Sequence, residues 1–306
     1  MSHIYIYSPA GAVRDKSAFK RGVKRLQARG HEVEIDEAAL ASHLRFAGDD
    51  ATRLAAIGRA AASGADVALI SRGGYGLTRL LGQLPFKALS KAVDRGTQFV
   101  GVSDFTALQL ALLARTGATT WAGPALGADF GVEGTPDDIM EACFDDLLVG
   151  HGEGAGWTLP AADARAHAAH PDRRVRKAVL WGGNLSVLCS LVGTPYLPAI
   201  RGGVLFLEDV NEHPYRIERQ LTQLLNAGVI GAQKAVLLGS FSPFKLVPGH
   251  DRGFKLQTVV DWLRAQTKTP VYTGLPYGHV PTKVMLPVGR QVDLLVQGRE
   301  ALLYWG

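Results

Sequence analysis

The chain has 306 residues, of which 47% are hydrophobic and 20% charged. This balance is typical of a soluble globular protein and excludes a disordered or collagen-like chain. The net charge is +5, but the densest basic run, 173–177, is short and lacks interleaved aromatic residues. We interpret this run as a solvated loop and expect no nucleic-acid partner.

Neither a membrane span nor a secretion signal is expected. No segment has roughly 18 consecutive apolar residues, and the N-terminus alternates like a strand instead of showing a signal-peptide pattern. The two cysteines, Cys143 and Cys189, lie in apolar-periodic segments and are expected to be free and buried. These features together predict a cytoplasmic protein. Since no metal-ligand spacing occurs, we expect it to bind no metal.

In the first 117 residues, segments with strand patterns alternate with segments that have helix patterns. Strands are expected at 3–8, 31–35, 66–70 and 98–102, and helices at 15–29, 50–63, 77–83 and 105–115. This α/β alternation predicts a doubly wound parallel sheet with helices on both faces. Ligands of such sheets bind beyond the carboxyl ends of the strands.

The remaining chain predicts a second, smaller domain. Residues 131–177 are first acidic and then rich in Ala and His, and we interpret them as a connection between domains at 1–130 and 178–306. Strands are expected at 178–181, 203–209 and 234–239, helices at 214–227 and 253–266, and a meander at 283–305. The C-terminal domain is therefore expected to be mixed and β-rich.

Two sequence segments follow buried strands of the N-terminal domain and could bind an oxyanion. Ser103 lies at a strand-to-helix turn two residues after Gly101, which is half of a nucleophile elbow; the alternative is that Ser103 or Asp104 only caps the helix. The loop 72–76 has three glycines in four positions, so its backbone N–H groups could turn toward a ligand; the alternative is a tight turn.

Two further candidates follow strands of the C-terminal domain. The apolar strand 203–209 ends in Glu208 and Asp209, where a carboxylate could orient an imidazole or simply be solvated. His279 follows Gly278 after an apolar strand and could be a general base or a structural histidine.

Seven motifs in order resemble those of the LD-carboxypeptidases, also called muramoyltetrapeptide carboxypeptidases, a family of serine peptidases that includes microcin self-immunity hydrolases. They lie at 71–76 (SRGGYG), 101–108 (GVSDFTAL), 182–186 (GGNLS), 193–196 (GTPY), 206–210 (FLEDV), 214–217 (PYRI) and 276–279 (PYGH). The resemblance extends from residue 4 to nearly the C-terminus. Two positions depart from the family pattern, Val102 before the nucleophile and Ala122 before Gly-Pro, and both concern the substrate pocket.

The resemblance implies a triad of Ser103 as nucleophile, His279 as general base and acid, and Glu208 as the orienting carboxylate. It implies an oxyanion hole made by the backbone N–H groups of Gly74 and Asp104. It also implies a homodimer and no cofactor.

Four residues near these motifs are candidate substrate contacts, each with a structural alternative. Arg72 could clamp a carboxylate or form an internal salt bridge, and Asn184 could bind substrate or cap a helix. Trp181 could line the pocket or pack in the core, and Tyr75 is an aromatic residue near the site.

We therefore expect a peptidase that releases terminal D-alanine from muropeptide tetrapeptides during peptidoglycan recycling. Two alternatives remain. One is a microcin-type hydrolase of peptidyl-nucleotide amides, and the other is a non-catalytic muropeptide-binding module.

Overall fold

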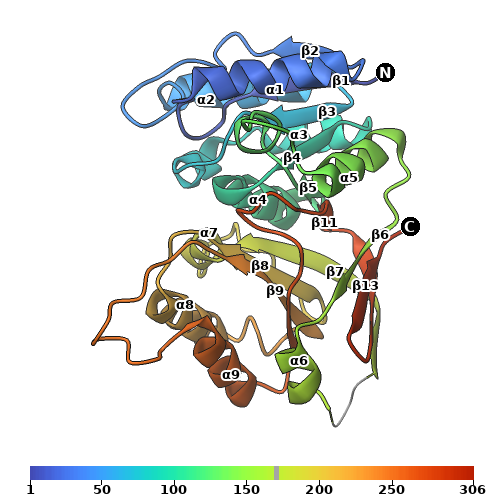
Figure 1. The fold of residues 1–306 in the computed structure, drawn as a ribbon. Helices are drawn as coiled ribbons and strands as arrows, with labels where there is room; N and C mark the ends of the chain where they lie inside the picture. Colours follow the sequence, from blue (N-terminus) through green and yellow to red (C-terminus); the bar gives the residue numbers. More distant parts are fainter. Residues whose placement is uncertain (169–171) are drawn as a thin grey trace. The chain divides into compact units, whose positions relative to one another are not determined.

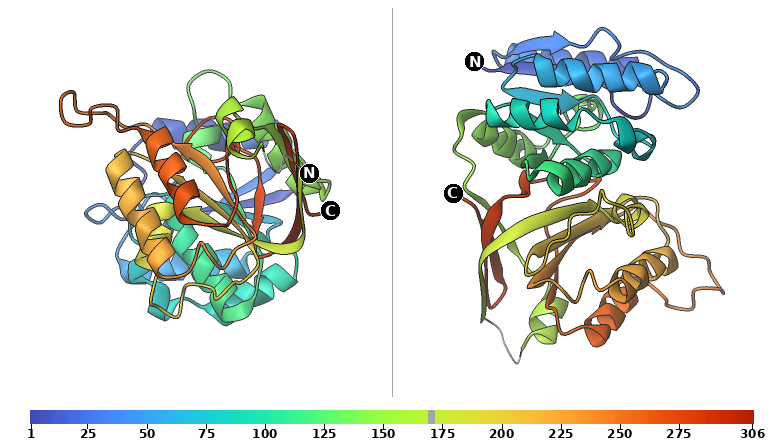
Figure 2. Two further views of the ribbon diagram at one scale, coloured as in Figure 1. Left: turned by 90° about the horizontal axis from the view of Figure 1, so that it is seen from below. Right: turned by 180° about the vertical axis from the view of Figure 1, so that it is seen from behind.

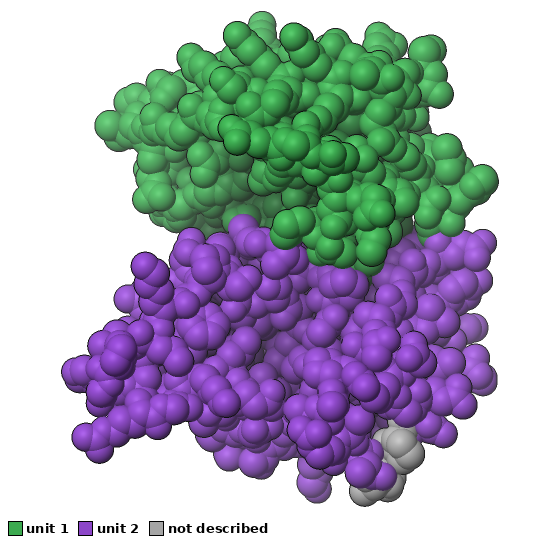
Figure 3. Space-filling view, viewed as in Figure 1, with its two compact units in different colours: residues 1–152, 195–198, 281–289 green, residues 153–194, 199–280, 290–306 purple. Residues whose placement is uncertain are grey.

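The computed structural model describes residues 1–168 and 172–306, and the chain divides into two units (Figure 3). Unit 1 comprises residues 1–152, 195–198 and 281–289, and unit 2 comprises residues 153–194, 199–280 and 290–306. The connection expected at 131–177 is divided between the units, because 131–152 belongs to unit 1 and the rest to unit 2. Residues 169–171 of that connection lie outside the described residues. The chain thus enters each unit more than once.

Unit 1 is built on a six-stranded sheet in the order β11-β5-β4-β3-β1-β2. Its strands are β1 (His3–Tyr7), β2 (Glu32–Ile35), β3 (Val67–Ile70), β4 (Gln98–Gly101), β5 (Thr120–Ala122) and β11 (Leu286–Val288). All neighbours are parallel except β11, which is antiparallel to β5. The doubly wound parallel sheet expected for the N-terminal region is therefore confirmed.

Helices cover both faces of this sheet, with α1 and α5 on one face and α2, α3 and α4 on the other (Figures 1 and 2). They are α1 (Lys16–Ala28), α2 (Asp50–Ala62), α3 (Phe86–Asp94), α4 (Thr106–Thr116) and α5 (Asp138–Val149). Local sequence sets their ends. Asp15 caps α1 by accepting a hydrogen bond from the Ala18 N–H at 2.8 Å, and Gly117 ends α4 in a left-handed conformation at φ +75°.

The helix expected at 77–83 is instead two short 3-10 helices, η1 (Leu77–Arg79) and η2 (Leu81–Gln83). Pro85 disfavours the helical conformation at Leu84, whose ψ is 137°, and Gly76 precedes the segment. The interval between Gly76 and Pro85 is thus too short for a longer helix.

Unit 2 contains a seven-stranded sheet in the order β10-β9-β8-β7-β12-β13-β6. Its strands are β6 (Gly154–Thr158), β7 (Asp172–Asn184), β8 (Val204–Asp209), β9 (Ala235–Phe241), β10 (Val271–Thr273), β12 (Gln291–Gln297) and β13 (Glu300–Tyr304). Strands β7 to β10 pair in parallel, and β7, β12, β13 and β6 pair antiparallel. The expected mixed, β-rich character is confirmed.

The described part of unit 2 has four helices: α6 (Ala161–Ala166), α7 (Leu185–Ser190), α8 (Pro214–Asn226) and α9 (Leu256–Gln266). Helices α8 and α9 lie side by side next to the parallel strands (Figures 1 and 2). Among the residues that the structure describes, no helix is both long enough and apolar enough to cross a bilayer.

Two expectations for this region are wrong. The basic run 173–177 is the first part of β7 and not a loop: its backbone pairs with β12, and Arg173, Arg174 and Arg176 keep their side chains exposed. The segment 283–305 is no single meander, because β11 pairs with β5 in unit 1 while only β12 and β13 pair with each other. Both cysteines are free, as expected; Cys189 is buried, as expected, whereas Cys143 is only half-buried.

Candidate active site

Ser103 lies between the end of β4 and the start of α4, in the 3-10 helix η3 (Ser103–Phe105). Its φ of +68° is in the left-handed region, which a non-glycine residue rarely adopts. Gly101 permits the turn, because a Cβ there would lie 2.6 Å from the Phe105 ring. A strained serine at a strand-to-helix turn is the geometry of a nucleophile elbow.

The glycine loop, residues 72–76, lies directly against Ser103 within unit 1. A Cβ on Gly73 would be 2.6 Å from the Ser103 Cβ and 2.9 Å from its Oγ, so only glycine fits without a shift. Gly74 has a φ of +119°, and the Gly11 N–H donates to the Gly73 carbonyl at 3.2 Å. The loop therefore presents backbone, not side chains, to the serine.

The Asp104 side chain holds the far end of the glycine loop. It is 2% exposed, and its Oδ2 accepts a hydrogen bond from the Leu77 N–H at 2.8 Å. Burial raises the pKa of Asp104 to about 6. The fully buried Arg53 donates from Nη1 to the Gly76 carbonyl at 3.0 Å. The sequence suggested the backbone N–H of Asp104 for the oxyanion hole, or Asp104 as a helix cap; the contact of its side chain with Leu77 and the role of Arg53 were not predicted.

The two other residues named in this loop differ in exposure. Arg72 donates from Nη1 to the Ala12 carbonyl at 3.0 Å, and burial lowers the pKa of its guanidinium, with Arg14 and Arg45 acting in the same direction. Among the described residues Arg72 forms no salt bridge, and this backbone carbonyl is its hydrogen-bond partner. Tyr75 is 47% exposed.

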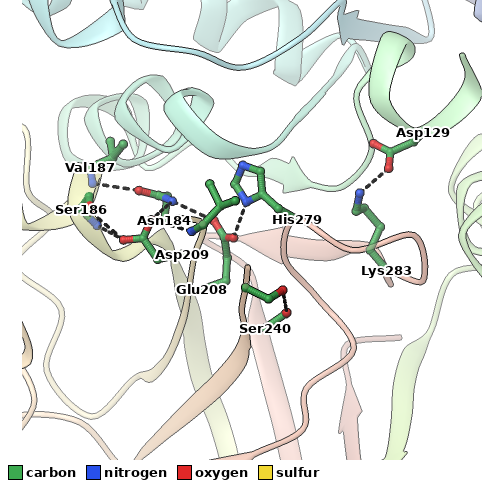
Figure 4. Close-up of polar contacts among 11 residues, drawn as sticks. Asp129, Asn184, Ser186, Val187, Glu208, Asp209, Ser240, His279 and Lys283 are labelled. Atoms are coloured by element: carbon green, nitrogen blue, oxygen red, sulfur yellow. Dashed lines mark hydrogen bonds and ion pairs between the residues drawn. The ribbon is translucent and has the colours of Figure 1, made fainter. Parts of the chain in front are cut away.

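Glu208 and His279 meet in unit 2, at the carboxyl end of β8 (Figure 4). The His279 Nδ1–H donates to the Glu208 Oε2 at 2.7 Å, and the Glu208 side chain is fully buried. Gly278 has a φ of +140°, and a Cβ there would lie 3.1 Å from Ser240 and 3.4 Å from the Glu208 Cβ. Because Nδ1 is the donor, Nε2 is left as the acceptor that a general base needs.

Asn184 bridges the two carboxylates that end β8 (Figure 4). Its Nδ2 donates to the Glu208 Oε1 at 3.2 Å and to the Asp209 Oδ1 at 2.9 Å, while its Oδ1 accepts from the Val187 N–H at 3.1 Å and caps α7. Asp209 also accepts from the Ser186 N–H and Oγ. The cap was among the sequence expectations, but the contact with Glu208 was not.

Trp181 lies in the core of unit 2. It is 1% exposed, and its Nε1 donates to the Gln233 Oε1 at 3.1 Å. This is the packing alternative of the two that the sequence left open.

The candidate residues thus form two groups. Ser103, Asp104 and the glycine loop belong to unit 1, whereas Glu208, His279 and Asn184 belong to unit 2. Within residues 1–168 and 172–306, no group of three or more His, Cys, Asp and Glu side chains is arranged to hold a metal ion.

Similarity to known protein families shows the family to which this chain belongs. The sequence matches the LD-carboxypeptidase N-terminal domain over residues 4–123 and the LD-carboxypeptidase C-terminal domain over residues 177–294. The two matches cover most of the chain and define an enzyme, a peptidase. The chain belongs to the LD-carboxypeptidase family, which confirms the resemblance seen in the seven motifs.

Individual relatives agree with this assignment. A murein tetrapeptide carboxypeptidase of Pseudomonas aeruginosa is 33% identical over 230 residues, which cover 73% of this chain and 70% of the relative. The crystal structure of muramoyltetrapeptide carboxypeptidase from Oxalobacter formigenes has a TM-score of 0.87 at 38% identity and covers 99% of this chain and 98% of that one. The chain is therefore a carboxypeptidase by its relatives as well as by its family.

A second kind of relative is the microcin C7 self-immunity protein MccF of Escherichia coli. It is 28% identical over 228 residues, which cover 67% of this chain and 65% of MccF. A wild-type structure of MccF has a TM-score of 0.84 at 22% identity over 100% of this chain and 96% of that one, which shows a shared fold.

Proposed function

We propose that this carboxypeptidase releases terminal D-alanine from muropeptide tetrapeptides, cutting between the L-centre of a diamino acid and the D-residue, in peptidoglycan recycling. The names of the Pseudomonas and Oxalobacter relatives support this substrate class. The observation that carries the chemistry is the hydrogen bond between His279 and the buried Glu208. A carboxylate in this position orients an imidazole and stabilises it when protonated.

In the proposed reaction, the Ser103 Oγ attacks the scissile carbonyl while the His279 Nε2 takes its proton. The imidazolium then protonates the leaving D-alanine amine, and an acyl-enzyme on Ser103 remains. Water attacks this ester, His279 accepts the water's proton and returns it to the Ser103 Oγ, and the peptide leaves with a new carboxylate. Glu208 balances the imidazolium charge in both halves.

The oxyanion of each tetrahedral intermediate would be bound by the backbone N–H groups of Gly74 and Asp104. Two observations support the role of Gly74. The loop carrying it lies against Ser103, and its N–H has no hydrogen-bond acceptor among the described residues. Of the remaining candidates, the exposed Tyr75 and the half-buried Arg72 stay proposed substrate contacts, whereas the burial of Trp181 favours packing.

The proposal includes a cytoplasmic location and a homodimer, both implied by the family resemblance. Light scattering of the purified protein after size exclusion tests the dimer, and a monomer at micromolar concentration would contradict it.

The decisive test is mass spectrometry of free tetrapeptide and disaccharide-tetrapeptide incubated with wild type, with Ser103→Ala and with Ser190→Ala as the control. Ser190 is an exposed serine in α7, so its variant should release D-alanine like wild type. Ser103→Ala should lose roughly 10³-fold or more in kcat. Turnover that survives in Ser103→Ala would exclude Ser103 as the nucleophile, and binding without turnover by wild type would favour a binding module.

The similarity to MccF supports a second candidate, hydrolysis of a peptidyl-nucleotide amide. Aspartyl sulfamoyl adenosine, which occurs in a complex of MccF, is a suitable probe. Cleavage of this compound without cleavage of any tetrapeptide would replace the main proposal by the second.

A further inference from the structure

A pocket of about 650 Å³ lies in unit 2, outside the groups described above. Two segments line it: the turn after β8 together with the first turn of α8, and the long loop between β9 and α9. In Figures 1 and 2 this loop, drawn in orange, extends well beyond the strands and helices of unit 2. Neither Glu208 nor His279 lines the pocket.

The pocket begins close to the proposed catalytic carboxylate. Asn211, which lines it, is the third residue after Glu208, so their Cα atoms are at most about 11 Å apart. The second lining loop starts beside the same strand end, because the Ser242 N–H donates to the Asp209 carbonyl at 3.2 Å. An extended tetrapeptide spans about 14 Å, so a substrate held near Glu208 can reach the pocket.

Basic groups outnumber acidic ones in the lining. They are His213, Arg216, Lys245 and His250, against the single acid Asp251. Asp251 is already engaged, since the His213 ring lies 3.1 Å from its Oδ2 and the Val247 N–H donates to it. The hydrogen bond from Val247 is the largest cause that lowers the pKa of Asp251, and His213 adds to it.

The two strongest cations of the lining are available to a ligand. Arg216 lies 3.8 Å from Glu212 and is half-exposed, and Lys245 has no acidic partner among the described residues. Tyr215 is 50% exposed, and its ring lies 5.9 Å from the Arg216 guanidinium, so it forms a wall beside that cation. A pocket with two exposed cations, of which Lys245 has no acidic partner among the described residues, and with an aromatic wall suits a carboxylate on an organic framework.

We propose that this pocket is a subsite for a carboxylate of the peptide substrate on the acyl side of the scissile bond. The inference rests on the proposed function and extends it, because it makes the enzyme selective for acidic peptide stems. Arg216 and Lys245 are its specificity-determining residues. Neither takes part in bond breaking, so they should act on substrate binding and not on the chemical step.

The test compares two tetrapeptide substrates that differ only in whether the carboxylates upstream of the diamino acid are free or converted to carboxamides. Steady-state kinetics are measured for wild type, Lys245→Met, Lys245→Arg and Arg216→Met. Lys268→Met is the control, because Lys268 is exposed and precedes β10, at the opposite end of the parallel strands.

With the free-acid substrate, Lys245→Met and Arg216→Met should each raise KM by roughly tenfold to 100-fold and leave kcat within about twofold, as expected for a lost hydrogen bond to a charged group. Lys245→Arg should restore the wild-type KM. The carboxamide substrate should have a high KM with every variant. Equal effects on both substrates, or an unchanged KM for the free acid, would overturn the subsite.

Failure of the proposed function gives a different result. If no tetrapeptide is cleaved, calorimetric binding of the two peptides to Ser103→Ala, alone and combined with Lys245→Met, still decides the subsite. Tighter binding of the free acid that disappears with Lys245→Met supports the subsite, and equal affinities overturn it.

Discussion

Replacing Gly73 with alanine tests the close approach of the glycine loop to the proposed nucleophile. The new Cβ would lie 2.6 Å from the Ser103 Cβ, whereas carbon atoms in contact are about 3.5 Å apart, so the loop or the serine must move by about 1 Å. The Ser103 Cβ is fixed by the backbone, so a rotation of the side chain does not relieve this contact. The φ of Gly73 lies outside the left-handed region, so alanine introduces a steric problem without a backbone problem.

Two magnitudes follow from this displacement. Overpacking of this kind costs about 1 to 3 kcal/mol of unfolding free energy. A shift of about 1 Å in a reacting group lowers turnover by roughly 100-fold. We therefore expect Gly73→Ala to remain folded, with a modestly lower unfolding temperature and a strongly reduced kcat for D-alanine release.

The matched control is Gly58→Ala in α2, where a Cβ would have no heavy atom within 4 Å. This variant should gain about 0.5 to 1 kcal/mol and keep wild-type turnover, because alanine is favoured over glycine inside a helix. If Gly73→Ala keeps its turnover within twofold and its unfolding temperature unchanged, the reasoning from the close contact is refuted.

Three further predictions concern other contacts. Burial raises the pKa of Asp104 to about 6, so the stability linked to this carboxyl is lost as pH rises from about 4 to about 6. In denaturant unfolding, the free energy of unfolding of Asp104→Asn minus that of wild type should therefore increase over this window and level off at about 3 kcal/mol. A difference that does not change with pH would contradict this prediction. Lys283→Met leaves the buried Asp129 without its ion-pair partner and should lower the free energy of unfolding by about 3 to 5 kcal/mol. Adding Asp129→Leu to this variant should restore most of that free energy. In Asn184→Ser the serine can still cap α7 but cannot reach Glu208. The kcat should therefore fall roughly tenfold at constant KM. Unchanged kinetics would mean that Asn184 acts only as the cap of α7.

The strand ends that carry the candidate residues could be predicted because apolar runs and glycines mark them locally. Ser103, Glu208 and His279 each follow such a run, and the structure places Glu208 beside His279 although 71 residues separate them. The pairing of Glu208 with His279 was expected from the family motifs, because hydrophobic periodicity does not indicate which distant residues are in contact. The α/β alternation similarly predicted the parallel sheet of unit 1 without its strand order.

Contacts between distant residues could not be predicted. The hydrogen bond from Leu77 to Asp104 and the ion pair between Lys283 and Asp129 (Figure 4) join residues 27 and 154 positions apart, and neither pattern is visible in a local window. The charges at 173–177 hid a strand, because an exposed strand face can carry arginines as readily as a loop can. Strand β11 has an ordinary strand pattern, but nothing local says that it pairs with β5.

The return of residues 281–289 to unit 1 affects how this protein is made on the ribosome. Strand β11 and Lys283, which complete the sheet edge at β5 and neutralise Asp129, are synthesised after almost all of unit 2. Domains usually fold in the order in which they emerge. Here unit 1 emerges first but receives its last strand only after residues 153–280 have been synthesised. A nascent chain or a fragment truncated before residue 281 should therefore hold Ser103 in an unfinished unit, so that the enzyme gains its activity only after residues 281–289 have been synthesised.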